Sequence, residues 1–341
     1  MREIFSSDAA VCYAKTADSS SAVEGDDGVT SRERIKTVLS HREADCVPYR
    51  MRLDRDLEER FNTLYCGGAH HCDFFDDDIH SVNIDGEFIY PVSYDAYSFD
   101  DLPMPAEASF AKMKRDVETL HVRGKAAFNP YTPGVYETMT ALMGPEEALA
   151  AMVLDPGGMH KKIEKVAQWE IELAVKKAMT GIDIMLIGDD LGAQKSLIMS
   201  PECYRAFYKP WHAELVNRVK RANPEVKVAF HCCGYVVALI PDLIDCGIDI
   251  LETLQPEANN DRAFIKEQYG KDLCFWGGIG MQSVFWGRPP EYVIGKVREA
   301  IELLAPGGGY ICAPCHIATP DIPPENIKAF YDAVNKYKYY A

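Results

Sequence analysis

The stretch GIDIMLIGDDLG, residues 181–192, decides the fold. Its segment Ile182–Ile187 is a short apolar run that only Asp183 interrupts, and it is followed by a glycine and two aspartates. A short apolar run bounded by turn residues is typical of a strand that is buried on both faces, as in a parallel sheet. We therefore predict a strand here, with the carboxyl groups of Asp189 and Asp190 directly after its end.

The same pattern recurs along the chain as a short apolar run, a polar or glycine-rich turn and a helical segment. The predicted strands are Val47–Met51, Ile79–Ile84, Ala126–Phe128, Ile182–Ile187, Val226–Phe230, Ile248–Leu251, Leu273–Trp276 and Tyr310–Ala313. The predicted helices are Pro145–Leu154, His160–Thr180, Pro201–Ala222, Val236–Cys246, Asp261–Gln268, Pro290–Leu304 and Pro323–Tyr337. About eight alternating units favour a closed (β/α)8 TIM barrel over an open doubly wound sheet. No Gly-x-Gly-x-x-Gly turn follows an early strand, so a dinucleotide-binding fold has no support.

The chain is predicted to form one domain, residues 31–341, after an N-terminal extension, residues 1–30. Its length of 341 residues fits a single α/β barrel, and no low-complexity linker divides it. Ser31 can cap the first helix, although Arg34 stands where a capping box would have glutamate.

Charge and cysteine content restrict the class of function. The formal net charge of -16 argues against binding to nucleic acid or to an anionic membrane surface. No apolar run reaches the roughly 20 residues of a membrane span, and no signal peptide is apparent. The eleven cysteines show no regular spacing of a disulfide framework. We expect a cytoplasmic protein with reduced thiols that binds small molecules.

Residues suited to chemistry gather at the predicted strand ends, where the site of a parallel barrel lies. The candidates at or near these ends are Arg50, Arg52, Glu137, Asp189, Asp190, His231, Cys233, Glu252, Gln255, Cys315 and His316, and Tyr310 at the start of the last predicted strand is a further candidate. Acidic, thiol and imidazole groups therefore converge on one rim.

The pair His231-x-Cys233 is the sharpest of these features. Residues i and i+2 of an extended strand point to the same side, so both side chains can face one point. A thiolate with an imidazole is a zinc-binding pair. Cys315 or His316 can supply a third ligand, and Glu252 can complete or orient the shell. The alternative is a cysteine-rich strand in the core whose histidine is satisfied by hydrogen bonds.

For each acidic and basic candidate, both functional and purely structural roles are possible. Asp189 and Asp190 can polarise a substrate, orient a zinc ligand or cap a turn. Glu137 can bind substrate or complement the dipole of a helix. Arg50 and Arg52 can bind carboxylates or phosphates, or form surface salt bridges.

Two other groups are predicted not to be functional sites. The acidic run Asp76–Asp78 is predicted to be a solvated turn. Cys66, His70, His71 and Cys72 have the composition of a metal cluster, but their spacing fits no four-ligand pattern.

A family resemblance rests on motifs distributed over most of the chain. These are residues 47–52 (VPYRMR), 181–192, 200–202 (SPE), 231–234 (HCCG), 241–244 (PDLI), 247–250 (GIDI), 277–282 and 308–327. From about Ser31 to its end the sequence resembles the uroporphyrinogen decarboxylase superfamily, whose members fold as (β/α)8 barrels. Decarboxylases of this family carry Met-Arg-Gln-Ala-Gly-Arg-Tyr, but here Leu53 follows Met51-Arg52. Their Phe-Ser-Asp motif is not evident, and Asp77 and Asp78 are loose substitutes.

The corrinoid-dependent methyltransferase branch of the superfamily resembles this chain better. Several of its members bind zinc through a His-x-Cys pair and a late cysteine, which implies His231, Cys233 and Cys315 as ligands, with His316 as the alternate. We predict catalytic roles for Asp189, Asp190, Glu137 and Glu252, and substrate contacts by Arg50, Arg52, Gln255 and Tyr310.

The implied activity is methyl transfer between a small methyl ether, alcohol, amine or thiol and cobalamin. No Asp-x-His-x-x-Gly motif is present, so a separate corrinoid protein would carry the cobalamin. A homodimer would be ordinary for this family. One alternative is a cofactor-free decarboxylase with a basic pocket of Arg50, Arg52 and Arg55. Another is a non-catalytic ligand-binding barrel.

Overall fold

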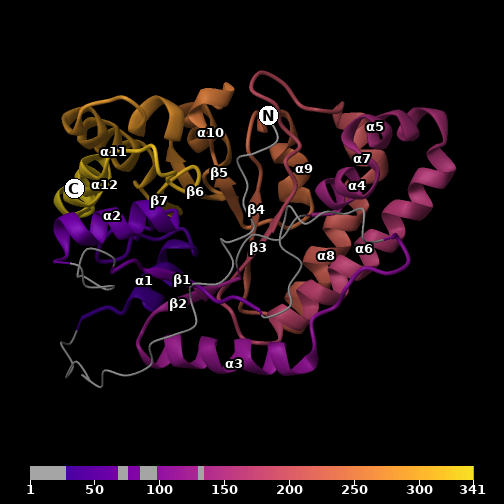
Figure 1. The fold of residues 1–341 in the computed structure, drawn as a ribbon, viewed down its shortest axis with the longest axis horizontal. Coiled ribbons are helices and arrows are strands. Elements are labelled where there is room, and N and C mark those ends of the chain that lie inside the picture. Colours follow the sequence, from indigo (N-terminus) through magenta and orange to yellow (C-terminus); the bar gives the residue numbers. More distant parts are fainter. Residues whose placement is uncertain (1–27, 68–75, 85–97, 130–133, 341) are drawn as a thin grey trace.

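The computed structural model describes residues 28–67, 76–84, 98–129 and 134–340. Seven strands in this part of the chain form one parallel sheet whose strand order follows the sequence. They are β1 Ile79–Ser81, β2 Ala126–Phe128, β3 Ile184–Gly188, β4 Lys227–His231, β5 Ile250–Thr253, β6 Cys274–Ile279 and β7 Tyr310–Pro314. The sheet curls and helices cover its outside, as Figure 1 shows. The predicted α/β class is confirmed, and the barrel-like architecture is consistent with a TIM barrel.

The predicted strand Val47–Met51 is a bridging segment and not a regular strand. Tyr49 pairs in parallel with Cys312 of β7, and the Cys312 N–H donates to the Pro48 carbonyl at 2.8 Å. On the other side, the Tyr49 N–H donates to the Asp78 carboxylate at 3.0 Å, and the Asp78 N–H donates to the Tyr49 carbonyl at 3.2 Å. A carboxylate therefore replaces one main-chain acceptor, and Pro48 has no N–H to give. The segment occupies the place of an eighth strand without completing its ladder.

The inside of the curled sheet is filled by alternate residues of all seven strands. This inner cluster contains Ile79, Ala126, Phe128, Ile184, Leu186, Ala229, Ile250, Cys274, Trp276, Ile311 and Ala313. Ile35 and Leu39 belong to the same cluster, and the Gly309 N–H, directly before β7, donates to the Val38 carbonyl at 2.9 Å. The first helix therefore closes the amino-terminal end of the sheet, and the opposite end is left for the site.

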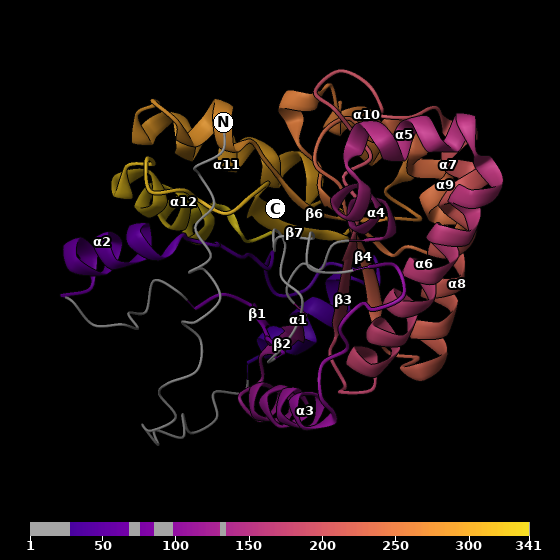
Figure 2. The same ribbon diagram turned by 45° about the vertical axis from the view of Figure 1, so that its right-hand side comes forward.

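The helices pack around the sheet in the order of the chain. They are α1 Ser31–Val38, α2 Arg55–Tyr65, α3 Glu107–Val122, α4 Val135–Met143, α5 Pro145–Leu154, α6 Pro156–Ala178, α7 Pro201–Phe207, α8 Lys209–Ala222, α9 Ile240–Asp245, α10 Arg262–Tyr269, α11 Pro290–Leu304 and α12 Pro324–Tyr337. Short turns η3 Val237–Leu239, η4 Pro256–Ala258 and η5 Met281–Phe285 complete the list. Helices α6 and α8 lie side by side in both views, as do α11 and α12 (Figures 1 and 2).

Two predicted helices are broken by proline. The segment Pro201–Ala222 divides into α7 and α8 because Pro210 has no N–H to donate to the preceding turn, where its ring would also clash. The segment Val236–Cys246 divides into η3 and α9, with Pro241 at the start of α9. Both prolines take first-turn positions, which they tolerate.

The first helix begins one residue earlier than predicted. Thr30, and not Ser31, is the cap: its hydroxyl accepts from the Glu33 N–H at 3.2 Å, and the Glu33 carboxylate accepts from the Thr30 N–H at 2.9 Å. A complete capping box is therefore present, and the expectation that Arg34 stands at its fourth position is wrong. Residues 1–27 of the predicted extension lie outside the described residues.

Two members of the acidic run before β1, Asp77 and Asp78, are buried, so the predicted solvated turn is wrong for them, whereas Asp76 is exposed and pairs with Lys125. Asp78 is 2% exposed and accepts from Arg34 and from the Tyr49 N–H. Asp77 accepts from the Met51 N–H at 3.1 Å, and its burial raises the pKa of its carboxyl to about 7. Both carboxylates therefore join the bridging segment to β1. Cys66 caps α2, whereas His70, His71 and Cys72 lie outside the described residues.

No helix in the described ranges is long and apolar enough to cross a membrane.

Candidate metal centre

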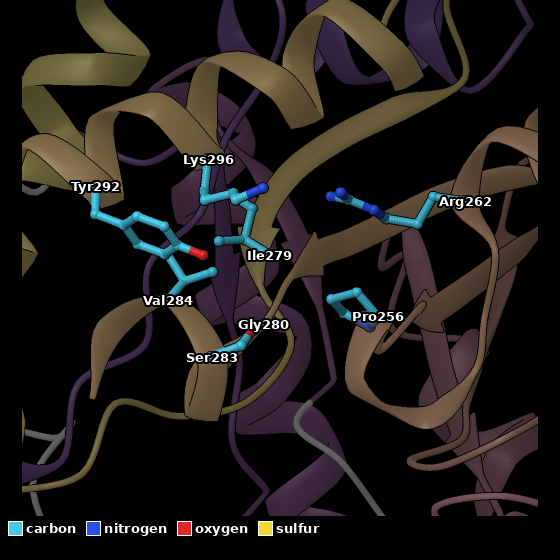
Figure 3. Close-up of a pocket in the computed structure, with 8 residues that line it drawn as sticks. All are labelled: Pro256, Arg262, Ile279, Gly280, Ser283, Val284, Tyr292 and Lys296. Atoms are coloured by element: carbon cyan, nitrogen blue, oxygen red, sulfur yellow. The ribbon is translucent and has the colours of Figure 1, made fainter. Parts of the chain in front are cut away.

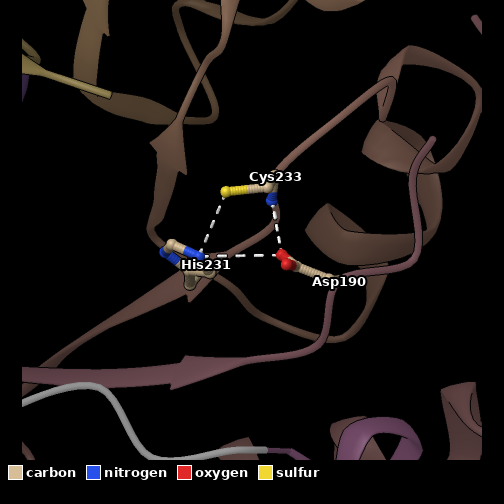
Figure 4. Close-up of side chains that lie close together, drawn as sticks. All are labelled: Asp190, His231 and Cys233. Carbon is tan, nitrogen blue, oxygen red and sulfur yellow. Dashed lines mark hydrogen bonds and ion pairs between the residues drawn. The ribbon is translucent and has the colours of Figure 1, made fainter. Parts of the chain in front are cut away.

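Three side chains meet at the carboxyl ends of β3 and β4. Asp190 follows β3, His231 is the last residue of β4 and Cys233 lies two residues further on. Their candidate ligand atoms all lie within 4.8 Å of one another, as Figure 4 shows. The His231 Nε2 atom is 3.5 Å from the Cys233 Sγ atom and 3.6 Å from the Asp190 Oδ1 atom. The predicted convergence of His231 and Cys233 is therefore present, with Asp190 as the third member.

The strand register explains why residues so far apart in sequence meet here. Gly188 of β3 pairs with His231 of β4, so the turns after both strands leave the sheet at the same level. These turns approach closely, since a Cβ atom on Gly234 would lie 2.5 Å from the Gly192 carbonyl oxygen. Gly234 also has a φ of 84°, which favours glycine. The Cys233 N–H donates to the Asp190 carboxylate at 2.6 Å and fixes that side chain.

Glu252 of β5 orients the histidine. Its carboxylate contacts the Nδ1 atom of His231, the residue with which it pairs across the sheet. Burial disfavours the charged imidazole, but the Glu252 carboxylate and Cys233 outweigh it and hold the pKa of His231 well above its ordinary value. An acceptor on Nδ1 leaves Nε2 facing Cys233, which is the arrangement of a metal-binding histidine.

The donor set fits zinc. A thiol, an imidazole and a carboxylate are all groups that bind Zn²⁺, and three protein ligands leave a fourth position for substrate. Burial raises the pKa of the Cys233 thiol, although its hydrogen bond to His231 opposes this. A bound cation would replace these protons, because zinc ligands bind in their deprotonated forms.

Cys315 and His316 stand outside this trio. The buried Cys315 thiol donates to the Thr253 carbonyl at 3.2 Å, and burial together with Glu257 raises its pKa well above the ordinary range. The negative charges of Glu252 and Cys233 also contribute to this rise in the pKa of Cys315. His316 is exposed, and its Nδ1 atom is 3.4 Å from the Ile317 carbonyl. A ligand role for either residue stays a prediction.

Glu137 lies in the first turn of α4, close to the trio. Its N–H donates to the Asp189 carboxylate at 2.9 Å. Its Oε2 atom is buried and has no hydrogen-bond partner among the described residues. Burial and the negative charges of Asp190 and Asp189 raise the pKa of the Glu137 carboxyl to about 8. The helix-start interpretation is correct for its backbone, while its half-buried side chain carries a carboxyl of raised pKa that interacts electrostatically with Asp190 and Asp189.

Asp189 points away from the trio. Its side chain is fully buried, and its Oδ2 atom is 2.9 Å from the Nε2 atom of His212 in α8. The predicted turn-capping and substrate-facing interpretations both differ from this placement, because neighbouring residues after a strand point in opposite directions. Sequence reasoning overlooked His212.

The predicted substrate-binding residues divide between the inside of the barrel and its wall. Arg50 is 9% exposed, and its guanidinium lies 4.2 Å from the Phe128 ring centroid and 5.9 Å from that of Trp276. It therefore points into the barrel, and the surface salt-bridge interpretation is wrong for it. Arg52 is half-buried and acts electrostatically on His316.

Two further substrate-binding candidates, Gln255 and Tyr310, form hydrogen bonds to main-chain groups of the protein. The Gln255 Oε1 atom accepts from the Gly234 N–H at 3.0 Å and holds the turn that carries Cys233. Tyr310 is fully buried at the amino-terminal start of β7, and its hydroxyl donates to the Gly277 carbonyl at 2.9 Å. The Tyr310 side chain therefore packs in the core, and a contact between it and substrate stays a prediction.

A separate cavity of about 140 Å³ lies between η5, α10 and α11 (Figure 3). Arg262 and Lys296 point toward each other across it, but both already pair with Glu299, at 2.8 and 2.6 Å. None of the predicted site residues lines this cavity.

The fold and the site define a barrel-like α/β protein with a candidate metal centre at the carboxyl rim of its sheet. The family model of uroporphyrinogen decarboxylase (URO-D) matches residues 131–337. The chain belongs to this family, as the sequence motifs predicted.

Relatives with two different activities match the chain. The methylcobamide:CoM methyltransferase MtaA of Methanosarcina barkeri is 30% identical over 173 residues, which cover 49% of this chain and 46% of that protein. The uroporphyrinogen decarboxylase of Trichodesmium erythraeum is 23% identical over 176 residues, 52% of this chain and 47% of that protein. The matches therefore span about half the length of these curated relatives.

A solved structure shows a similar fold over almost the whole chain. A methyltransferase from Methanosarcina mazei superposes with a TM-score of 0.69 at 16% identity, covering 90% of this chain and 99% of its own. The curated relatives that match this chain thus include a methyltransferase and a decarboxylase.

Proposed function

We propose that this protein is a zinc-dependent methyltransferase. It would move a methyl group between a small methyl ether, alcohol, amine or thiol and the cobalamin of a separate corrinoid protein. The observation that carries the proposal is the meeting of His231, Cys233 and Asp190 at the rim. The similarity to a methyltransferase named for methylcobamide and CoM adds support.

The three side chains of the trio would hold the metal ion. When bound, zinc supplies a Lewis acid that stabilises negative charge on a substrate heteroatom. Glu252 keeps Nε2 of His231 turned toward the ion, and the Cys233 N–H holds the Asp190 carboxylate in place. Cys315, whose thiol now donates to Thr253, is the proposed additional ligand, with His316 as its alternate.

Glu137 is the proposed proton-handling residue. Transfer of a methyl group away from oxygen or nitrogen leaves an electron pair on that atom, which then takes up a proton. The Glu137 Oε2 atom is buried without a hydrogen-bond partner in the described structure, and the pKa of the Glu137 carboxyl is raised. A carboxyl that keeps its proton near neutral pH suits this role.

The second candidate function is a cofactor-free decarboxylase. It is favoured by Arg50, whose cation lies inside the barrel against Phe128. The basic pocket predicted for it is not assembled, however, because the Arg55 side chain is 60% exposed and pairs with Glu59 on the surface of α2 at 3.1 Å. A non-catalytic ligand-binding barrel is the third candidate, and it requires no metal.

Metal content tests the proposal. The protein is purified without oxygen, and zinc is measured by mass spectrometry in the native chain, in Cys233→Ala and in Cys232→Ala. Cys232 is the matched control, because it is the neighbouring buried cysteine and is not a member of the trio. We expect about one zinc per chain in the native protein and in Cys232→Ala, and loss in Cys233→Ala. Native protein without zinc, or Cys233→Ala that retains it, would contradict the proposal.

Methyl transfer is measured next with the zinc-loaded protein. Candidate methyl donors are supplied with a cobalamin acceptor, whose absorption spectrum reports methylation. Activity in the native chain that disappears in Cys233→Ala is expected. Release of carbon dioxide from a carboxylated substrate by both proteins would instead support the decarboxylase.

A further inference from the structure

Behind the candidate metal centre, three buried residues form one continuous hydrogen-bonded chain. Asp189 follows β3, His212 belongs to α8 and Tyr204 belongs to α7, and none of them is more than 1% exposed. The His212 Nε2 atom is 2.9 Å from the Asp189 Oδ2 atom, and the His212 Nδ1 atom is 3.0 Å from the Tyr204 hydroxyl. These three hydrogen-bonded residues connect the rim of the sheet to the outer layer of helices.

The direction of these hydrogen bonds depends on the tautomer of His212, and an ionised Asp189 with a neutral His212 gives one consistent pattern. An ionised carboxylate only accepts, so Nε2 of His212 carries the hydrogen that it donates to Asp189. In the neutral imidazole, Nδ1 is then an acceptor for the Tyr204 hydroxyl. The second carboxylate oxygen of Asp189 accepts from the Glu137 N–H at 2.9 Å. Both oxygens of Asp189 are therefore engaged.

The packing around this chain leaves little room for movement. A Cβ atom on Gly134, directly before α4, would lie 1.6 Å from the Gly188 carbonyl oxygen and 2.6 Å from the Asp189 carboxyl carbon. The His212 ring packs edge-on against Phe230 of β4, with centroids 5.2 Å apart. The start of α4 and the end of β3 are thus pressed together at Asp189.

We infer that Asp189, His212 and Tyr204 position the two acidic groups of the site, Asp190 and Glu137. Asp189 is covalently adjacent to Asp190 and hydrogen-bonded to the backbone of Glu137. Its carboxylate is directed by His212, and His212 is directed by Tyr204. His212 and Tyr204 are positioning residues, since neither reaches the trio. The inference rests on the proposed metal centre for its functional meaning.

The test compares four variants. His212→Phe keeps an aromatic ring against Phe230 and removes both ring nitrogens. His212→Gln keeps an N–H near the position of Nε2. Tyr204→Phe removes only the terminal hydroxyl. Tyr208→Phe is the matched control, because Tyr208 is a fully buried tyrosine between α7 and α8 whose hydroxyl has no hydrogen-bond partner in the described part of the chain.

Two measurements are made on each variant. The first is the rate of alkylation of Cys233 by iodoacetamide in metal-free protein, followed by peptide mass spectrometry. The second is the affinity for Co²⁺, followed by the visible absorption bands of the bound ion. Thermal unfolding in the same buffer shows whether each variant is folded.

The expected changes in alkylation rate and Co²⁺ affinity are larger for His212, which contacts Asp189, than for Tyr204, which acts on Asp189 through His212. His212→Phe should alkylate at Cys233 about threefold faster or more, because the Asp190 carboxylate that binds the Cys233 N–H is no longer held. Its Co²⁺ affinity should fall about 10-fold, the low end of the effect of partners behind metal ligands. Tyr204→Phe should lose roughly threefold, His212→Gln should recover most of the loss, and Tyr208→Phe should match the native protein.

The outcomes separate the inference from the proposed function. If His212→Phe and Tyr208→Phe give equal alkylation rates and equal Co²⁺ affinities, the positioning inference is overturned while the metal centre stands. If the native protein binds no Co²⁺ but Cys233 alkylation still distinguishes these variants, the positioning inference stands and the metal proposal fails. Equal alkylation without Co²⁺ binding overturns both.

Discussion

Two aspartates stand at opposite ends of β3, and their surroundings differ in kind. Asp183, before the strand, accepts from Arg32 at 2.8 Å, from His121 at 2.8 Å and from the Ala127 N–H at 2.9 Å. Asp190, beyond the other end, accepts from the Cys233 N–H and otherwise faces His231. The first carboxylate has two basic side chains as partners, whereas the second sits among thiol, imidazole and further carboxyl groups. The amino-terminal end is built for stability, whereas the trio that contains Asp190 includes no lysine or arginine.

The largest expected effect is a loss of stability on substitution of Asp183, at the amino-terminal end of β3. Asp183→Ala should lower the free energy of unfolding by about 3 kcal/mol, because it leaves two buried or half-buried basic groups without their carboxylate. Asp190→Asn should cost less than about 1 kcal/mol, since its side chain is 38% exposed. Urea unfolding at pH 7 measures both. Zinc content should show the reverse pattern, retained in Asp183→Ala and lost in Asp190→Asn.

Zinc itself should stabilise the protein through the rim alone. Free zinc at about 100 times its dissociation constant should raise the free energy of unfolding by about 2.7 kcal/mol, since it binds the folded state only. The rise should occur in the native chain and in Asp183→Ala, but not in Cys233→Ala. Unfolding with and without a chelator measures it, and an equal rise in Cys233→Ala would place the metal elsewhere.

Asp77 sharpens the comparison, because it is a buried carboxyl on the amino-terminal side of β1 with a raised pKa. The unfolded chain loses this proton near pH 4, whereas the folded protein keeps it to about pH 7. Stability contributed by the protonated group is therefore full below pH 4 and decreases as the pH rises to 7, on the order of 1 kcal/mol per pH unit. Between pH 5 and pH 7 the native chain should lose about 2 kcal/mol more than Asp77→Asn. Parallel pH dependences in urea unfolding would show that Asp77 does not titrate in this range.

The smallest expected effect concerns the surface cation that the decarboxylase alternative needs. Arg55→Ala should change stability by less than about 0.5 kcal/mol, because the Arg55 side chain is 60% exposed and its ion pair with Glu59 lies on the surface. It should also leave zinc content and activity unchanged. A large loss of activity in this variant, measured against Arg298→Ala as another exposed ion-pair control, would return weight to a basic pocket.

The strands that could be predicted from the sequence are those that consist of a local apolar run. Ile182–Ile187 and Val226–Phe230 are apolar runs, and the structure places β3 and β4 within two residues of them. The Val47–Met51 segment was mispredicted as a strand because its ladder depends on the distant Asp78 carboxylate, which no local pattern reveals. The solvated-turn prediction for Asp77 failed for the same reason: only tertiary contacts bury it.

The site could be predicted in part. His231 and Cys233 share one strand end, so their spacing alone brings them together. Asp190 stands two residues past β3 as Cys233 stands two residues past β4, and this parallel placement was the available signal for it as their partner. His212 gives no such signal, because a histidine inside an amphipathic helix is an ordinary feature of the sequence. Only the crossing of α8 behind β3 brings it to Asp189.

The bridging segment at Tyr49 has a consequence for the motion of the barrel. Two of its amides, those of Tyr49 and Met51, are held by side chains, and its neighbour β1 has three residues, so few main-chain bonds close the wall there. Local opening should therefore begin between this segment and β1, and amide hydrogens of residues 49–51 should exchange with deuterium faster than those of residues 227–231 in β4. Arg50 lies just inside this wall. The part of the barrel that we expect to open first is therefore next to the buried guanidinium of Arg50.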